Sequence, residues 1–146
     1  MPSESEVDWA IQRFSNLYWH DSRLLQQHVL RRTESRGYDV RLDFDFIQDY
    51  GTGKPKYAPK SLIFLDCQLI QSELDLFGMT FTRGTISEAT FCRSFAELDA
   101  ETQKPFRRYD LQNMPINPIR DCFYLRIELI PPGGSITLFA RLLEEM

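Results

Sequence analysis

His20 is the first candidate for a catalytic residue, because the chain has only two histidines and this one is followed by Asp21 and Ser22. These are the three residue types of a hydrolase triad. Triads, however, are assembled from separated segments, and three consecutive side chains cannot converge on one reacting atom. No Gly-x-Ser-x-Gly elbow presents a nucleophile either. We therefore predict no catalytic residue in this chain.

The same turn is still a candidate for binding. We expect Trp19 to pack under a preceding helix, and Asp21 or Ser22 to bond nearby backbone groups. The candidate binding residues are Trp19, His20 and Asp21, since a histidine can sense pH or contact a partner. A small ligand-binding β-fold, or a hydrolase that uses His20 with a carboxylate, is the alternative, and it requires a concave pocket beside His20.

The sequence predicts no metal site and no cofactor. The spacing between His20 and His28 is not one that zinc proteins use, and there is no His-Glu-x-x-His motif. The cysteines form no Cys-x-x-Cys pair and are odd in number: Cys67, Cys92 and Cys122. We expect them to be free, buried apolar side chains in a protein of a reducing compartment.

Carboxylates gather on the polar faces of two predicted strands, over residues 40–46 and 69–77. In both segments apolar and polar residues alternate, which gives a strand one buried and one solvated face. The plain interpretation is a solvated sheet face, in which Arg41 relieves the repulsion between carboxylates. The functional interpretation is an acidic surface that recognises a basic protein. The candidate binding residues on these faces are Asp43, Asp45, Glu73 and Asp75.

Length and charge narrow the classes of protein further. A chain of 146 residues with 42% apolar content fits one domain, residues 1–146, around one core. The net charge of −4 argues against nucleic-acid binding, which needs a concentrated basic face. No apolar run reaches the roughly 18 residues that span a bilayer, and the polar start Met-Pro-Ser-Glu-Ser-Glu is no signal peptide. We therefore expect a cytoplasmic protein without membrane contact.

The periodicity predicts a mainly β fold. One N-terminal helix over 4–16 precedes a chain of short strands with turn signals and no alternation of strands with helices, which indicates an antiparallel β-sandwich or a curved sheet. Residues 85–98 fit a strand better than a helix, and 99–119 form a long irregular connection whose apolar residues either fold onto the sandwich or form a contact patch. The expected strands are 24–32, 40–46, 61–66, 69–77, 122–130 and 135–143, with a loop at 49–60, a turn at 78–80 and a Pro-Gly reversal at 131–134.

The order of features resembles small bacterial β-rich domains of unassigned function, including groups among polymorphic-toxin immunity proteins. The resemblance rests on Trp19-His20-Asp21-Ser22 after an N-terminal helix, and on the final strand Gly133-Gly134-x-Ile136-x-Leu138-x-Ala140. It implies a non-catalytic protein that binds and neutralises another protein, and it transfers no catalytic residue. A structural subunit whose exposed edge strand pairs with a second copy, making a homo-oligomer, is a further alternative.

Overall fold

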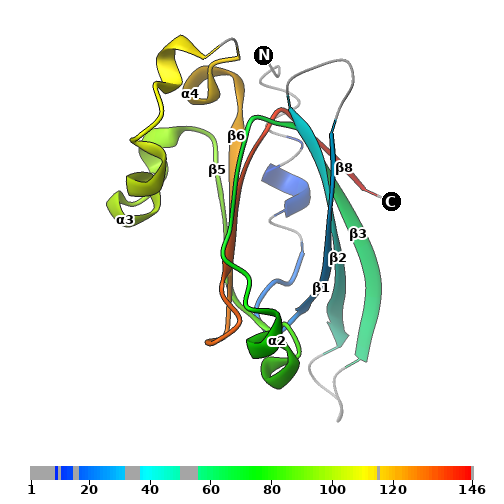
Figure 1. The fold of residues 1–146 in the computed structure, drawn as a ribbon. Coiled ribbons are helices and arrows are strands. Elements are labelled where there is room, and N and C mark those ends of the chain that lie inside the picture. The colour runs from blue at the N-terminus through cyan, green and yellow to red at the C-terminus, as the bar shows by residue number, and fades with distance from the viewer. Residues whose placement is uncertain are drawn as a thin grey trace.

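The computed structural model describes residues 9, 11–14, 17–31, 37–49, 56–114 and 116–145. They form two four-stranded antiparallel sheets that face each other (Figure 1). Sheet A has the order β1 (Arg23–Arg31), β2 (Tyr38–Asp49), β3 (Lys56–Cys67) and β8 (Leu142–Glu145). Sheet B has the order β4 (Leu69–Ser72), β7 (Ser135–Ala140), β6 (Phe123–Leu129) and β5 (Ile86–Cys92). The predicted mainly β, antiparallel sandwich-like fold is confirmed.

Period-two burial builds the core between the sheets. In β2, Val40, Leu42 and Phe44 are at most 1% exposed, whereas the residues between them are half-buried. Strands β6 and β7 supply the facing layer, with Ile127 and Leu138 fully buried. Two apolar faces that meet in this way exclude water from both, and that burial is the main stabilising term of the fold.

A short helix lies between the two sheets (Figure 1), where residues 9 and 11–14 are helical. Its Phe14 stacks on Trp19 with ring centroids 4.3 Å apart, and the Trp19 indole Nε1 donates to the Phe14 carbonyl at 2.8 Å. The edges of Phe44 and Phe46 meet the same indole. The predicted packing of Trp19 under the helix is confirmed; the remaining residues of the predicted helix 4–16 lie outside the described residues.

The chain crosses from one sheet to the other twice at the same corner. Strand β3 passes into β4 through Gln68, and β7 passes into β8 through Arg141. The crossings bond to each other, because the Gln68 N–H donates to the Phe139 carbonyl at 2.9 Å and the Arg141 N–H to the Leu65 carbonyl at 3.1 Å. An Arg141–Asp66 ion pair at 2.9 Å closes the corner. The single strand predicted over 135–143 is therefore divided between two sheets.

Two other predicted segments are corrected. The loop predicted at 49–60 is strand from Lys56 onward, although Pro59 stands inside it. Proline is tolerated there because β8 pairs with β3 only from Leu62 to Leu65, so that the side of β3 away from β2 has no strand neighbour at Pro59. The connection at 32–36 and residues 50–55 lie outside the described residues. The flanking strands β1 and β2 pair antiparallel, in agreement with the predicted antiparallel fold.

The strand predicted over 69–77 ends at Ser72, and the turn predicted at 78–80 belongs to helix α2 (Leu76–Thr82). Asp75 caps this helix, since its carboxylate accepts the Gly78 N–H at 2.9 Å. Gly78 also approaches Pro132 so closely that a Cβ would lie 2.3 Å from the Pro132 carbonyl oxygen. The contact of Gly78 with the β6–β7 loop therefore favours a helix here, although the alternation of apolar and polar residues over 69–77 predicted a strand.

Residues 93–122 connect β5 to β6. The strand predicted within 85–98 is confirmed for Ile86–Cys92. The rest of that strand prediction is wrong, because Phe95–Glu97 form the helical turn η1. The irregular connection predicted over 99–119 contains further short helical turns: α3 (Ala100–Gln103), η2 (Lys104–Phe106), η3 (Leu111–Asn113) and α4 (Pro118–Asp121). None of the helices in the described part of the chain is long and apolar enough to cross a membrane.

Candidate functional site

The outer face of sheet B is covered by the chain itself. We call residues 95–121 the covering segment; Figure 1 places its helices α3 and α4 on the side of sheet B away from sheet A. Phe106 is 3% exposed and meets the Phe139 ring edge-to-face at 4.4 Å. Tyr124 is fully buried, and its hydroxyl donates to the Pro118 carbonyl at 2.5 Å. The apolar residues of this connection therefore do not all fold onto the sandwich. Phe106 packs on sheet B, whereas Tyr109 and Ile119 are 42% and 37% exposed.

The outer face of sheet A keeps apolar side chains in contact with solvent. No described helix lies against it (Figure 1). Leu30 is 67% exposed, and Ile63 and Leu65 are half-buried. They line a hollow of about 320 Å³, which we call the sheet A hollow. Its lining residues are His28, Leu30, Asp39, Arg41, Ile63 and Leu65.

Beside the sheet A hollow, three strands converge on one carboxylate. The register sets Asp43 of β2 opposite Ser61 of β3, and β1 brings His28 alongside. His28 Nε2 lies 3.0 Å from Asp43 Oδ2, Ser61 Oγ donates to Asp43 Oδ1 at 2.6 Å, and Arg41 Nε lies 3.2 Å from Asp43 Oδ1. The hydrogen bond from Ser61 holds the pKa of Asp43 below its usual value, and His28 and Arg41 act in the same direction against the effect of burial.

This cluster contains a serine, a histidine and an aspartate, yet its connectivity is wrong for nucleophilic catalysis. In a triad the histidine stands between the other two, so that it takes the serine proton while the aspartate orients it. Here Asp43 stands in the middle and binds Ser61 and His28 on different oxygens. A carboxylate with a lowered pKa is a weak base for a serine hydroxyl. The cluster therefore stabilises the ionised form of Asp43 and fixes the rotamers of its neighbours.

The Trp19-His20-Asp21-Ser22 turn connects the two sheets. Ser22 is fully buried; its hydroxyl donates to the Tyr18 carbonyl and accepts the Ile47 N–H of sheet A. Asp21 adopts φ 67°, and its N–H donates to the Ile86 carbonyl of sheet B at 3.0 Å. The His20 side chain is 62% exposed, with Nδ1 3.1 Å from the Ser87 carbonyl oxygen. His20 lines neither hollow described in this section, and the predicted roles of Trp19, His20 and Asp21 in binding remain predictions.

The four carboxylates predicted to form acidic faces do not lie together. Asp43 and Asp45 share the outer face of sheet A, where the in-register neighbours of Asp45 are Arg23 and Pro59. Glu73 and Asp75 follow β4 of the other sheet and precede α2. Asp75 is a helix cap, and Glu73 accepts a hydrogen bond from the Gln71 amide at 3.3 Å. The expected second acidic strand face is therefore absent from residues 73–77, because β4 ends at Ser72.

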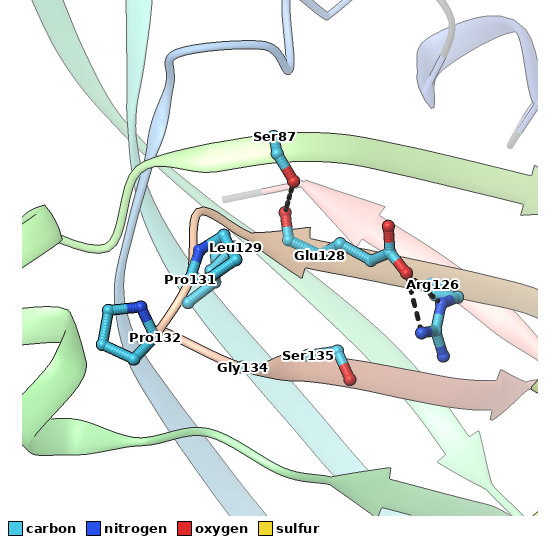
Figure 2. Close-up of a pocket in the computed structure, with 8 residues that line it drawn as sticks. All are labelled: Ser87, Arg126, Glu128, Leu129, Pro131, Pro132, Gly134 and Ser135. Carbon is cyan, nitrogen blue, oxygen red and sulfur yellow. Dashed lines mark hydrogen bonds and ion pairs between the residues drawn. The ribbon is translucent and has the colours of Figure 1, made fainter.

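A second hollow, of about 460 Å³, lies at the β6–β7 hairpin (Figure 2). Three of its polar side chains, Ser87, Arg126 and Glu128, already bind each other or the backbone. Arg126 donates to Glu128 Oε1 through Nε and Nη2, at 3.1 and 2.8 Å, and Ser87 Oγ donates to the Glu128 carbonyl at 3.1 Å. Nothing in this arrangement leaves a charged group directed at a ligand, so we give the sheet A hollow more weight.

Thiol and metal chemistry find no support in the described residues. No three histidine, cysteine, aspartate or glutamate side chains come together there as a metal site. The prediction of free, buried cysteines is confirmed for Cys67, Cys92 and Cys122. Burial raises the pKa of all three thiols, that of Cys122 to about 12, and the thiolate is the reactive form.

Comparison with known proteins finds no matching family model, curated protein or solved structure. The sheet A hollow is therefore the candidate functional site of this chain. Sequence reasoning did not name Leu30, Ile63 or Leu65 as candidates. A signal was present: Leu62–Leu65 is a continuous apolar run, and a strand with such a run has apolar side chains on both faces.

Proposed function

We propose that this chain is a non-catalytic protein-binding domain whose partner docks on the outer face of sheet A. The observation that supports it is the contrast between the two outer faces. Sheet B buries its outward apolar residues under the covering segment, whereas Leu30, Ile63 and Leu65 line an open hollow. Apolar side chains that stay exposed within a ring of charged ones are typical of a docking site for another protein.

The chemistry of the rim favours a basic partner. Asp39, Asp43 and Asp45 lie on this face with Arg41 on the same strand and Arg23 opposite Asp45, and the whole chain carries a net charge of −4. Such a potential attracts a cationic surface and raises its association rate. A partner that suits the sheet A hollow presents an aliphatic side chain flanked by lysine or arginine. Neutralising a basic toxin, as the resemblance to immunity proteins implies, is one such function.

Affinity capture with matched variants tests the proposal. The wild type, Ile63→Arg, Asp45→Lys and Phe77→Arg are immobilised and exposed to a lysate of the source cells, and each captured protein is then purified and titrated against the same four chains. Ile63→Arg places a charge in the sheet A hollow, and Asp45→Lys reverses a rim charge. Phe77→Arg is the control, because Phe77 is 74% exposed on α2, away from this face.

Support consists of a basic protein that binds the wild type and the control but loses at least about tenfold in affinity, or about 1.4 kcal/mol, with Ile63→Arg. Asp45→Lys should mainly slow association and weaken its dependence on salt. Equal affinity of all four chains would place the contact elsewhere and contradict the proposal.

A further inference from the structure

The edge strands of the two sheets are not equally protected. An edge strand offers unpaired backbone groups to any other strand, and proteins guard such edges with short strands, charges or a covering segment. Strand β4 has four residues, and β8 has four with two glutamates. In β5, Ile86 bonds the 21–22 turn through both its N–H and its carbonyl, and Glu88 stands in the middle. Strand β1 is less protected: the 84–85 segment pairs only with its first two residues, through an Arg23–Thr85 bridge and the bond from the Leu24 N–H to the Gly84 carbonyl, and its arginines stand only at the two ends.

Strand β1 is nine residues long, and its interior from Leu24 to Leu30 carries no aspartate, glutamate, lysine or arginine. Apolar side chains are exposed along it: Leu25 is 49% exposed, Val29 44% and Leu30 67%. A long edge with exposed apolar residues and no charge is the kind that pairs with another strand.

The sequence of β1 is nearly a palindrome. Read from either end, Arg-Leu-Leu-Gln-Gln-His-Val-Leu-Arg has similar residue types at matching positions, with Gln27 at the centre. An antiparallel pair of two such strands about a two-fold axis sets each position against its mirror position. A strand with this symmetry is suited to a second copy of itself.

The centre of the palindrome also carries a polar atom that lacks a partner. Among the buried side-chain atoms of the described residues, Gln27 Oε1 has no hydrogen-bond donor. Leaving a buried acceptor unsatisfied is costly, and such groups call for an explanation. This oxygen is already buried in the isolated chain, so the Gln27 side chain must rotate outward on pairing before the amide of the same residue in a second copy can donate to it across a two-fold axis.

We propose that two copies of this chain pair through their β1 edges, antiparallel, about a two-fold axis at Gln27. The pairing sets Gln26 opposite His28 of the partner subunit, on both sides of the central Gln27 pair. It joins the two A sheets into one continuous sheet. The register shift between Leu24 and Gln26 ends the matched stretch, so Arg23 is not held opposite Arg31 of the partner subunit; its guanidinium lies over the Tyr57 ring of its own chain, 4.1 Å from the centroid.

Dimerisation extends the surface proposed for partner binding. His28 and Leu30, which line the sheet A hollow, stand on the strand that forms the new contact. The second copy therefore adds its own β1 side chains to the open rim of that hollow, and the two hollows come to lie on one face. The dimer does not depend on the partner proposal, since the isolated chain tests it.

Solution mass measures the dimer directly. The mass of the purified wild type is determined by light scattering over an about hundredfold range of concentration, because subunit association follows mass action. We expect twice the chain mass of 17.2 kDa at the upper end of the range. Val29→Lys should restore the monomer, since it puts a charge in the pairing edge, whereas the control Phe77→Lys should behave as the wild type. A wild type that stays monomeric throughout overturns the proposal.

Cysteine substitution tests the register. In an antiparallel pair, opposite Cα atoms lie about 4.5–5.5 Å apart, within the range that a disulfide spans. Gln27→Cys should therefore form a covalent dimer under mild oxidation, while the native cysteines are buried. Leu30→Cys is the matched variant; it lies three residues from the axis, so its two copies are about 20 Å apart and should not cross-link. Equal cross-linking of both variants, or of neither, contradicts pairing about Gln27.

Discussion

The two outer faces of this sandwich differ in whether their apolar residues are covered. Each sheet carries apolar residues on the side away from the shared core. On sheet B the chain itself covers them, and Phe106, Tyr124 and Phe139 form a second buried cluster. On sheet A, Leu30 and Ile63 face solvent beside a hydrogen-bonded carboxylate cluster. Apolar residues on sheet B therefore contribute to stability, and those on sheet A are available for association.

The largest expected effect is the difference between Phe106→Ala and Leu30→Ala. Phe106 fills the space between the covering segment and sheet B, so its truncation leaves a cavity and should lower the free energy of unfolding by about 3–5 kcal/mol. Leu30 is 67% exposed, and its truncation should change the free energy of the monomer by less than about 0.5 kcal/mol. Urea denaturation of both variants measures the difference. Similar losses would erase the distinction between the faces.

A smaller effect is expected from Tyr124→Phe, which removes only the hydroxyl that binds the Pro118 carbonyl. The variant keeps the packing of the ring but leaves a carbonyl without its donor, at a cost of about 1–3 kcal/mol. We expect hydrogen exchange to accelerate in the covering segment more than in β2. Uniform acceleration would mean that the covering segment unfolds only together with the whole domain.

The smallest effect is expected on sheet A, from Asp43→Asn. The pKa of Asp43 is held below its ordinary value of 3.8 by Ser61 first, then by His28 and Arg41. Because the pKa in the folded state is lower than 3.8, the stabilisation by the charged carboxylate is fully present above pH 3.8 and is lost as the pH falls through the folded-state pKa. The variant should therefore be less stable than the wild type by about 1 kcal/mol at pH 7.

The two free energies should converge as the pH falls below 3.8. Both proteins should still lose stability in acid, since hydrogen bonds from Arg120 lower the pKa of Asp121 in the covering segment. An Asp43→Asn profile parallel to the wild type down to pH 2 would show that the cluster does not stabilise the charged carboxylate.

The alternation of apolar and polar residues in the sequence was enough to predict the strands that bury one face. The alternation around Phe44 and the Pro-Gly reversal after Ile130 were sufficient for β2 and for the β6–β7 pair. Helix α2 was not predictable in this way, because Leu-Phe-Gly-Met-Thr-Phe-Thr has weak helix propensity and the helix depends on the Asp75 cap and on the contact of Gly78 with Pro132.

The candidate site was predicted only in part. Asp43 was named from its polar face, but its partners His28 and Ser61 come from neighbouring strands, and only the register brings them within hydrogen-bond distance. Periodicity gives the face of a residue and not its cross-strand neighbour. The division of residues 135–143 at Arg141 was equally hidden, since the alternation continues while the chain changes sheets.

The strand order of sheet B has a consequence for synthesis on the ribosome. Its central strands, β7 and β6, come from the last quarter of the chain, whereas its edge strands β4 and β5 are made earlier. Until β6 and β7 leave the exit tunnel, the nascent polypeptide can pair β1, β2 and β3 but has no scaffold for β4 or β5. Sheet B is therefore the later sheet to form, and a chaperone has most to protect in the interval before β6 and β7 emerge.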